Sequence, residues 1–214
     1  MKKSIWLEKY EEQTKAKRDQ SMKGKNIVFI VLPIMFAIII IAAIAGGAMS
    51  TPEARGGMIG MIVLFAVIIL FVILVKSKAN KKDVTKFTRD CVNSLLETDD
   101  EVEQFDRQMQ SQPIMQIKTD IAETMFLTMD YVGKSSTYGG DLKYLFIKRT
   151  DIVSLNYCKM ASTTANPFKA SYAYDICNSQ NKVIMNGIAS TMQVFEEIEE
   201  LIKTARPSVV VNKK

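Results

Sequence analysis

The chain lacks histidine, the side chain with which many enzymes carry out acid–base chemistry. No histidine occurs among its 214 residues, which excludes Ser-His-Asp and Cys-His catalysis and the usual zinc ligand sets. The cysteines, Cys91, Cys158 and Cys177, share no close spacing, which indicates reduced thiols rather than disulfides or a metal centre. We therefore predict no catalytic, cofactor-binding or metal-binding residue, and we expect the protein not to be an enzyme.

A polar stretch bounded by glycines, residues 133–140, contains the tripeptide Gly-Lys-Ser that is found in phosphate-binding loops. Such a loop requires G-x-x-x-x-G-K-[ST] between a strand and a helix. The preceding TMDYV lacks the first glycine, and a strand is expected to follow, so the stretch predicts a turn. Asp130, Asp141 and Asp151 lie at the ends of predicted strands, where turn residues are a better interpretation than a metal cluster.

A second group of charged residues, Lys143, Lys148 and Arg149, could form a basic rim that faces a membrane. Their positions in a predicted strand favour a solvated strand face instead. Both interpretations depend on the elements that carry these residues, and those elements follow from the pattern of apolar residues along the chain.

Two apolar runs without a charge, residues 27–45 and 58–75, are joined by the short loop 46–57. At a rise of about 1.5 Å per residue, each run approaches the ~30 Å hydrocarbon core of a bilayer. The runs predict a two-helix transmembrane hairpin; the alternative is two buried helices of a soluble core. Small residues one turn apart, Ala42, Gly46, Gly56 and Gly60, predict close packing within the hairpin or, alternatively, a homo-oligomer interface.

The net charge of +5 is concentrated beside the apolar runs. Residues 1–26 contain eight Lys/Arg against four Asp/Glu, and residues 76–90 contain six against two, whereas the loop is neutral. This distribution predicts a multi-pass protein of the cell membrane, with the bilayer as a partner and both termini in the cytoplasm. It gives no support for nucleic-acid binding, which requires a basic face on a folded domain.

The segments that flank the hairpin are predicted to be helical. In the basic N-terminal segment 1–26, Ile5, Trp6, Leu7 and Tyr10 form the apolar face of an interfacial helix, or else belong to a disordered tail. The helical linker 76–112 has apolar residues at helical spacing, and the pair Thr98 and Glu101 fits a capping box. We expect two helices, 78–97 and 99–111, with one stalk helix as the alternative. The apolar stripes are Val84, Phe87, Cys91 and Leu95, then Val102, Phe105 and Met109.

Residues 113–207 are expected to form an antiparallel sheet of five or six strands followed by one helix. The expected strands are 114–118, 122–132, 142–149, 151–159, 171–177 and 182–188. The helix is expected over 191–205 with a capping box at Ser190 and Gln193, and residues 208–214 are expected to be a tail. Its apolar stripe comprises Val194, Phe195, Ile198, Leu201 and Ile202.

The order FLTMDYVG, IKRTDIVSLNY, KVIMNGI and FEEIEELI resembles bacterial membrane-anchored proteins with a pleckstrin-homology-like (PH-like) domain and two transmembrane helices. The resemblance implies an α+β membrane protein whose curled antiparallel sheet is capped by the C-terminal helix. Relatives that bind phosphoinositides use clustered basic residues in the first strand pair, where this chain has only Lys118 and Lys134, so no headgroup site is carried over.

These features together predict a non-enzymatic, membrane-tethered interaction module that presents a PH-like domain to a protein partner. The alternative is a subunit of a larger transporter or envelope complex, in which the hairpin would carry the interface. An enzyme is the least favoured class, because no nucleophile or metal constellation is recognisable.

Overall fold

The computed structural model describes residues 2–45, 57, 60, 62–70, 83–120, 122–137, 141–160 and 171–213. The chain divides into two units. Unit 1 comprises Met1–Thr14 and Val84–Lys214, and unit 2 comprises Lys15–Asp83. Unit 1 is therefore discontinuous in sequence, because unit 2 lies between its first residues and the rest.

The apolar runs belong to unit 2. Helix α1 (Ile5–Ala45) is one continuous helix whose first half carries the charged N-terminal residues. The side chains described within the first run are those of 34–36 and 38–41, and the longest described helical stretch of the second run is 62–70.

Among the described residues, no helix combines the length and the apolar character needed to cross a bilayer. This finding contradicts the predicted transmembrane hairpin with spans 27–45 and 58–75. It equally contradicts the integral-membrane fold class and the multi-pass localisation with cytoplasmic termini. The loop 46–57 lies outside the described residues except for Gly57, and so do Gly46 and Gly56.

The described side chains of unit 2 are largely apolar and exposed. The rings of Phe36 and Phe65 stack with centroids 3.5 Å apart, which brings the two helical stretches together. Large exposed apolar side chains occur on both stretches: Ile34, Met35, Ile38, Ile39, Ile41, Ile62, Val63, Leu64, Val67, Ile68 and Leu70.

Two short helices, α3 (Lys86–Leu95) and α4 (Asp99–Gln110), follow unit 2. The prediction of two helices is confirmed, and so is the capping box, but α3 begins at Lys86 and not at residue 78 as expected. Thr98 Oγ1 accepts a hydrogen bond from the Glu101 backbone N–H at 3.2 Å, and the Glu101 carboxylate accepts one from Thr98 N–H at 3.3 Å. The predicted apolar stripe of α3 is partly correct: Val84 is buried and Cys91 and Leu95 pack against a core cluster, but Phe87 is 51% exposed. The other buried residues are Thr85, Thr88, Val92 and Leu96.

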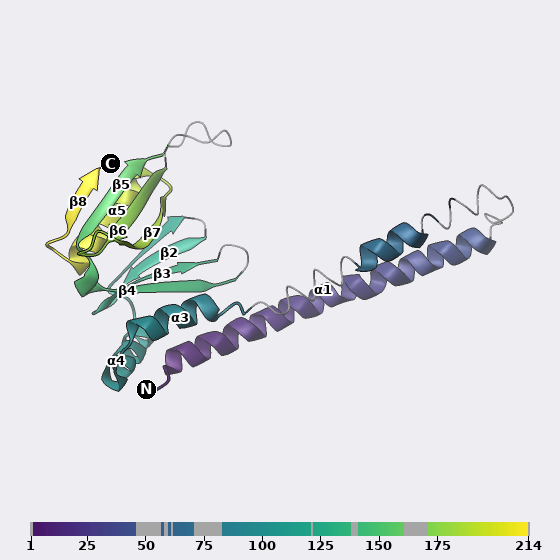
Figure 1. Ribbon diagram of the computed structural model, residues 1–214, viewed down its shortest axis with the longest axis horizontal. Coiled ribbons are helices and arrows are strands. Elements are labelled where there is room, and N and C mark those ends of the chain that lie inside the picture. The colour runs from purple at the N-terminus through teal and green to yellow at the C-terminus, as the bar shows by residue number, and fades with distance from the viewer. Residues whose placement is uncertain are drawn as a thin grey trace. The chain divides into compact units, whose positions relative to one another are not determined.

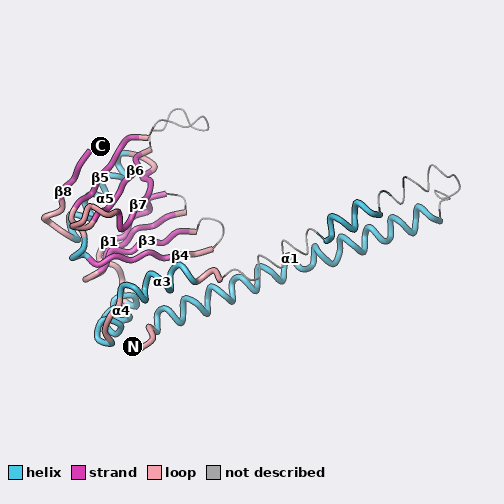
Figure 2. The backbone as a smooth tube through the Cα atoms, in the orientation of Figure 1, coloured by secondary structure: helices cyan, strands magenta, loops and turns pink. Residues whose placement is uncertain are grey.

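In the part of the chain that the structure describes, eight strands form two four-stranded sheets. Figures 1 and 2 show how the sheets are arranged. Sheet A has the order β1-β2-β3-β4 and is antiparallel throughout. Sheet B has the order β7-β6-β5-β8, and β8 runs parallel to β5. The strands of sheet A are β1 (Met115–Asp120), β2 (Glu123–Leu127), β3 (Tyr131–Ser136) and β4 (Lys143–Lys148). Those of sheet B are β5 (Ser154–Lys159), β6 (Tyr172–Cys177), β7 (Val183–Ala189) and β8 (Val210–Lys213).

The structure corrects the predicted strands at three places. The single curled sheet is replaced by two sheets, with a 3-10 turn at Arg149–Asp151 between β4 and β5. The expected strand 122–132 is interrupted by a turn, and the expected turn at Gly133 is part of β3. The expected C-terminal tail contains β8.

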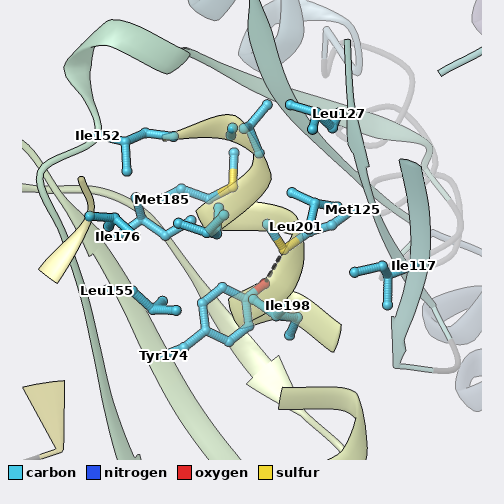
Figure 3. Packing of buried hydrophobic residues seen from close by; sticks show 14 of the residues in the cluster. Ile117, Met125, Leu127, Ile152, Leu155, Tyr174, Ile176, Met185, Ile198 and Leu201 are labelled. Atoms are coloured by element: carbon cyan, nitrogen blue, oxygen red, sulfur yellow. Dashed lines mark hydrogen bonds between the residues drawn. The ribbon is translucent and has the colours of Figure 1, made fainter. Parts of the chain in front are cut away.

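Helix α5 (Met192–Ala205) contributes the centre of the main core, where it packs on β1, β2 and β7. Its N-cap is Thr191 rather than the predicted Ser190, since Thr191 Oγ1 accepts a hydrogen bond from Val194 N–H at 3.2 Å. Figure 3 shows side chains of both sheets and of α5 converging in this core. The fully buried residues of α5 are Phe195, Ile198, Leu201 and Ile202, as their spacing predicts.

The strand register gives sheet A two distinct faces. One face carries Met125, Leu127, Val132 and Ile147 into the main core. The opposite face, called here the outer face, carries two rows of cross-strand neighbours. One row is Gln116, Phe126, Gly133 and Phe146, and the other is Lys118, Thr124, Ser135 and Tyr144.

Candidate functional site

The Gly-Lys-Ser tripeptide lies within β3 and does not form a phosphate-binding loop. Lys134 points to the opposite side of the sheet from Gly133 and Ser135, because neighbouring strand residues alternate. Its ammonium lies 3.3 Å from a Glu123 carboxylate oxygen and donates to the Asn186 carbonyl at 2.5 Å. Both side chains of this ion pair are 11% exposed, so Lys134 has a structural role.

The three aspartates singled out as turn residues do not form a metal centre. Asp130 lies in the β2–β3 turn, where its carboxylate accepts hydrogen bonds from the amides of Gln104 and Gln108. Asp151 lies in the 3-10 turn. In the part of the chain that the structure describes, no three His, Cys, Asp or Glu residues are grouped so that they could hold a metal ion.

The proposed basic rim is engaged in structural contacts. Lys148 Nζ lies 2.6 Å from the Glu101 carboxylate, and this hydrogen bond lowers the Glu101 pKa. The Arg149 guanidinium donates to carbonyl oxygens of Met129, Thr204 and Ala205 at 2.7, 3.0 and 2.7 Å. Arg149 thereby satisfies carbonyl groups at the C-terminus of α5, where a cation is also favoured by the helix dipole.

The cysteines are free thiols, and Cys91 accepts a hydrogen bond from the edge strand β4. Phe146 N–H donates to Cys91 Sγ at 3.3 Å, and Tyr144 N–H donates to Thr88 Oγ1 at 2.9 Å. Two residues on one face of α3 thus satisfy alternate donors along the outer edge of β4. Burial raises the pKa of the Cys91 thiol, which makes it a poor nucleophile.

The N-terminal residues, expected to be an interfacial helix or a tail, dock onto α4 within unit 1. Asp106, which is 6% exposed, accepts from Ser4 Oγ at 2.6 Å, Ile5 N–H at 2.8 Å and Trp6 N–H at 3.1 Å. Ser4 Oγ in turn accepts from Leu7 N–H at 3.1 Å. The carboxylate therefore satisfies donors that a helix N-terminus leaves without partners, and it complements the positive end of the helix dipole.

Docking places Trp6 in a cluster of aromatic rings. Trp6 stacks on Tyr10 with centroids 5.6 Å apart, and it meets Phe105, Tyr144 and Phe146 edge to face at 5.6, 5.2 and 5.3 Å. Tyr10 is also fixed by its hydroxyl, which donates to the Leu142 carbonyl at 2.6 Å. These contacts hold the indole ring in one orientation at the border of the outer face of sheet A.

A groove of about 250 Å³ lies beside Trp6, between the C-terminal end of α4 and the outer face of sheet A. Among the described residues, its lining contains aromatic, hydroxyl and amide side chains and no Asp, Glu, Lys or Arg. The lining residues are Trp6, Gln108, Met109, Ser111, Pro113, Gln116, Thr124, Phe126, Thr128, Ser135 and Tyr144. A charged ligand would find no counter-charge among these residues.

The flat ring of Phe126 lies over Gly133, its direct cross-strand neighbour. A β-carbon at Gly133 would overlap the Phe126 ring, so the missing side chain makes room for it. Phe126 also meets Tyr144 edge to face, with centroids 6.4 Å apart and an interplanar angle of 77°. Trp6, Tyr144 and Phe126 therefore line the groove as successive, roughly perpendicular rings.

Several polar atoms in the groove have no hydrogen-bond partner among the described residues. These atoms are the indole N–H of Trp6, the hydroxyls of Thr124, Ser135 and Tyr144, and the amide of Gln116. Burial raises the pKa of Tyr144, so its hydroxyl remains a neutral donor well above physiological pH. By contrast, Gln108 is committed to the β2–β3 turn, where its carbonyl accepts from Thr128 Oγ1 at 2.9 Å and Asp130 N–H at 3.0 Å.

Sequence reasoning did not identify this groove. Trp6 was placed on an apolar helix face together with its neighbour Tyr10, but its other ring partners lie on α4 and β4, far away in the sequence, so no local pattern predicts them. The pairing of Phe126 with Gly133 had a weak signal, because a glycine within a strand often marks a close approach by a neighbouring side chain or backbone.

None of the protein-family models, curated proteins or solved structures with which the chain was compared matches it. The resemblance to PH-like proteins therefore stays a prediction, and the functional argument depends on the geometry of unit 1.

Proposed function

We propose that the protein is a non-enzymatic interaction module, and that unit 1 binds an extended segment of a protein partner in the groove beside Trp6. The observation that carries the proposal is the composition of that groove: three aromatic rings and several hydrogen-bonding groups that have no partner among the described residues. Peptide-recognition surfaces use this combination, in which rings provide contact area and polar groups bind the peptide backbone.

The size and charge of the groove support a peptide over a small-molecule substrate. Its volume of about 250 Å³ is below the ~300–1,000 Å³ that is usual for small-molecule sites. The larger hollow of about 510 Å³ beside Arg149 is a weaker candidate, because the side chains of Lys148, Glu101, Arg149 and Asp130 that line it already bind other protein groups.

Selection from a random library of twelve-residue peptides, displayed against the immobilised full chain, tests this proposal. The groove variants are Gln116→Arg, at an exposed position in the lining, and Ser135→Arg, at a half-buried one. The matched control is Gln193→Arg, at an exposed position of α5. Circular dichroism and Trp6 fluorescence establish that each variant is folded.

We expect selected peptides to bind the wild type and Gln193→Arg equally, and to bind both groove variants at least tenfold more weakly. Peptides that bind all four proteins equally would place recognition elsewhere and refute the proposal. A selection that enriches no peptide would also refute it.

A further inference from the structure

The groove combines perpendicular aromatic rings with hydrogen-bond donors, and we infer from this geometry that it takes a proline-rich segment in the polyproline II conformation. This inference depends on the proposed function, since it names the class of peptide that the same groove binds.

The first argument is the match of hydrogen-bonding groups. A polyproline II segment makes no internal hydrogen bonds, and each proline contributes a carbonyl acceptor but no N–H donor. The groove offers the Trp6 indole N–H, which can only donate, together with the Tyr144 hydroxyl and the Gln116 amide. None of these groups has a hydrogen-bond partner among the described residues. A ligand rich in acceptors satisfies them without placing an unpaired donor of its own in the groove.

The second argument is the arrangement of the rings. Trp6 and Tyr144 have centroids 5.2 Å apart and an interplanar angle of 81°, and Tyr144 and Phe126 are related by 77° at 6.4 Å. Perpendicular rings leave concave corners between a ring face and a neighbouring edge. The pyrrolidine ring is compact, apolar and restricted in conformation, and prolines at successive turns of the three-residue helix present such rings at a regular interval.

The third argument is electrostatic. No acidic or basic side chain is among the described residues that line the groove, so neither a phosphorylated nor a basic peptide gains a counter-charge from them. A rigid uncharged segment compensates for the absence of ion pairs because it loses little conformational entropy on binding.

Titration of the full-length protein with a ten-residue polyproline peptide tests the inference, with a Gly-Ser peptide of equal length as the control ligand. Trp6 is the only tryptophan in the chain, and it lines the groove, so its fluorescence reports occupancy. Anisotropy of a labelled peptide gives an independent measure. We expect the polyproline peptide to bind at least tenfold more tightly than the Gly-Ser peptide.

Two substitutions test the assigned contacts. Tyr144→Phe keeps the ring and removes one donor, and should weaken polyproline binding about fivefold, the usual effect of one hydrogen bond. Ser135→Arg should weaken it more than tenfold, whereas Gln193→Arg should have no effect. Equal binding of the two peptides, or full polyproline binding by Ser135→Arg, would overturn the inference.

The library selection separates the two proposals. If it yields groove-dependent peptides without proline, the interaction module stands and the polyproline assignment is wrong. If neither the library nor the polyproline peptide shows groove-dependent binding, both proposals are wrong.

Discussion

Asp106 is the residue on which docking of the N-terminal segment most depends, and its replacement gives the sharpest test of the structure. Its carboxylate accepts three hydrogen bonds from Ser4, Ile5 and Trp6. A hydrogen bond to a charged group contributes about 1.5–3 kcal/mol. In Asp106→Asn, one oxygen still accepts from Ser4 and Trp6, but the amide group faces the Ile5 N–H, so one bond is lost. We expect a loss of about 2 kcal/mol in the free energy of unfolding of unit 1.

Asp106→Ala removes all three acceptors and should cost more, about 4 kcal/mol. Its cost cannot exceed the free energy with which residues 1–14 dock. Beyond that limit the segment leaves its site, and its N–H groups bind water instead. The alanine variant should therefore release the segment, whereas the asparagine variant should weaken it and leave it docked.

The single tryptophan reports this difference directly, because Trp6 is two residues from Ser4 in the same segment. We expect red-shifted emission and faster acrylamide quenching in Asp106→Ala, and near-native values in Asp106→Asn. Urea unfolding followed by Trp6 emission gives the free energies. The matched control is Asp100→Asn, an exposed position in the first turn of the same helix, which should change stability by less than about 0.5 kcal/mol. Trp6 that stays protected in Asp106→Ala would refute the assigned role of the carboxylate.

Substitutions at four further positions test the sheets and the alkaline stability. Gly187→Ala should cost about 1–3 kcal/mol in urea unfolding, because the added methyl collides with Tyr174, which is 1% exposed and cannot move aside. Gly133→Ala should cost less, because the half-buried Phe126 ring can swing toward the groove; an equal cost would contradict this. Asn181 lies in the β6–β7 turn with φ of 56°. Asn181→Gly should leave the free energy of unfolding unchanged, whereas Asn181→Ala should lower it by about 1 kcal/mol, measured by thermal unfolding. Burial raises the pKa of Tyr131 to about 12 in the folded state. The stability that this neutral hydroxyl contributes is therefore complete below pH ~10 and is lost as the pH rises toward 12. Tyr131→Phe should reduce this loss of unfolding free energy at alkaline pH, measured by urea unfolding at several pH values, and an unchanged dependence of the free energy on pH would contradict the assignment.

The elements with local signals could be predicted from the sequence. The Thr98–Glu101 capping box marks the start of α4, and the apolar stripe that includes Phe195 and Ile198 marks α5. These signals depend on residues three or four positions apart, so the side chains that create them are neighbours in any helix.

The β2–β3 turn could not be predicted, because it contains no glycine or proline and the apolar alternation continues through it. Thr128 and Tyr131 form local hydrogen bonds across it, and Gln108 on α4 also accepts hydrogen bonds from Thr128 and Asp130. The groove beside Trp6 was missed for the same reason. Its members come from α1, α4 and sheet A, and only the tertiary fold brings them together.

The discontinuity of unit 1 imposes an order on its synthesis. Residues 1–14 leave the ribosome first, yet Tyr10 binds the Leu142 carbonyl, 132 positions later in the chain. Until that point is translated, the apolar side chains of Leu7 and Tyr10 have no complete site to occupy, and closing so long a loop carries an entropic cost before contacts compensate it. Docking of the N-terminal segment should therefore be a late step of folding. Until then, the nascent chain exposes the apolar side chains of an amphipathic segment that is prone to aggregation.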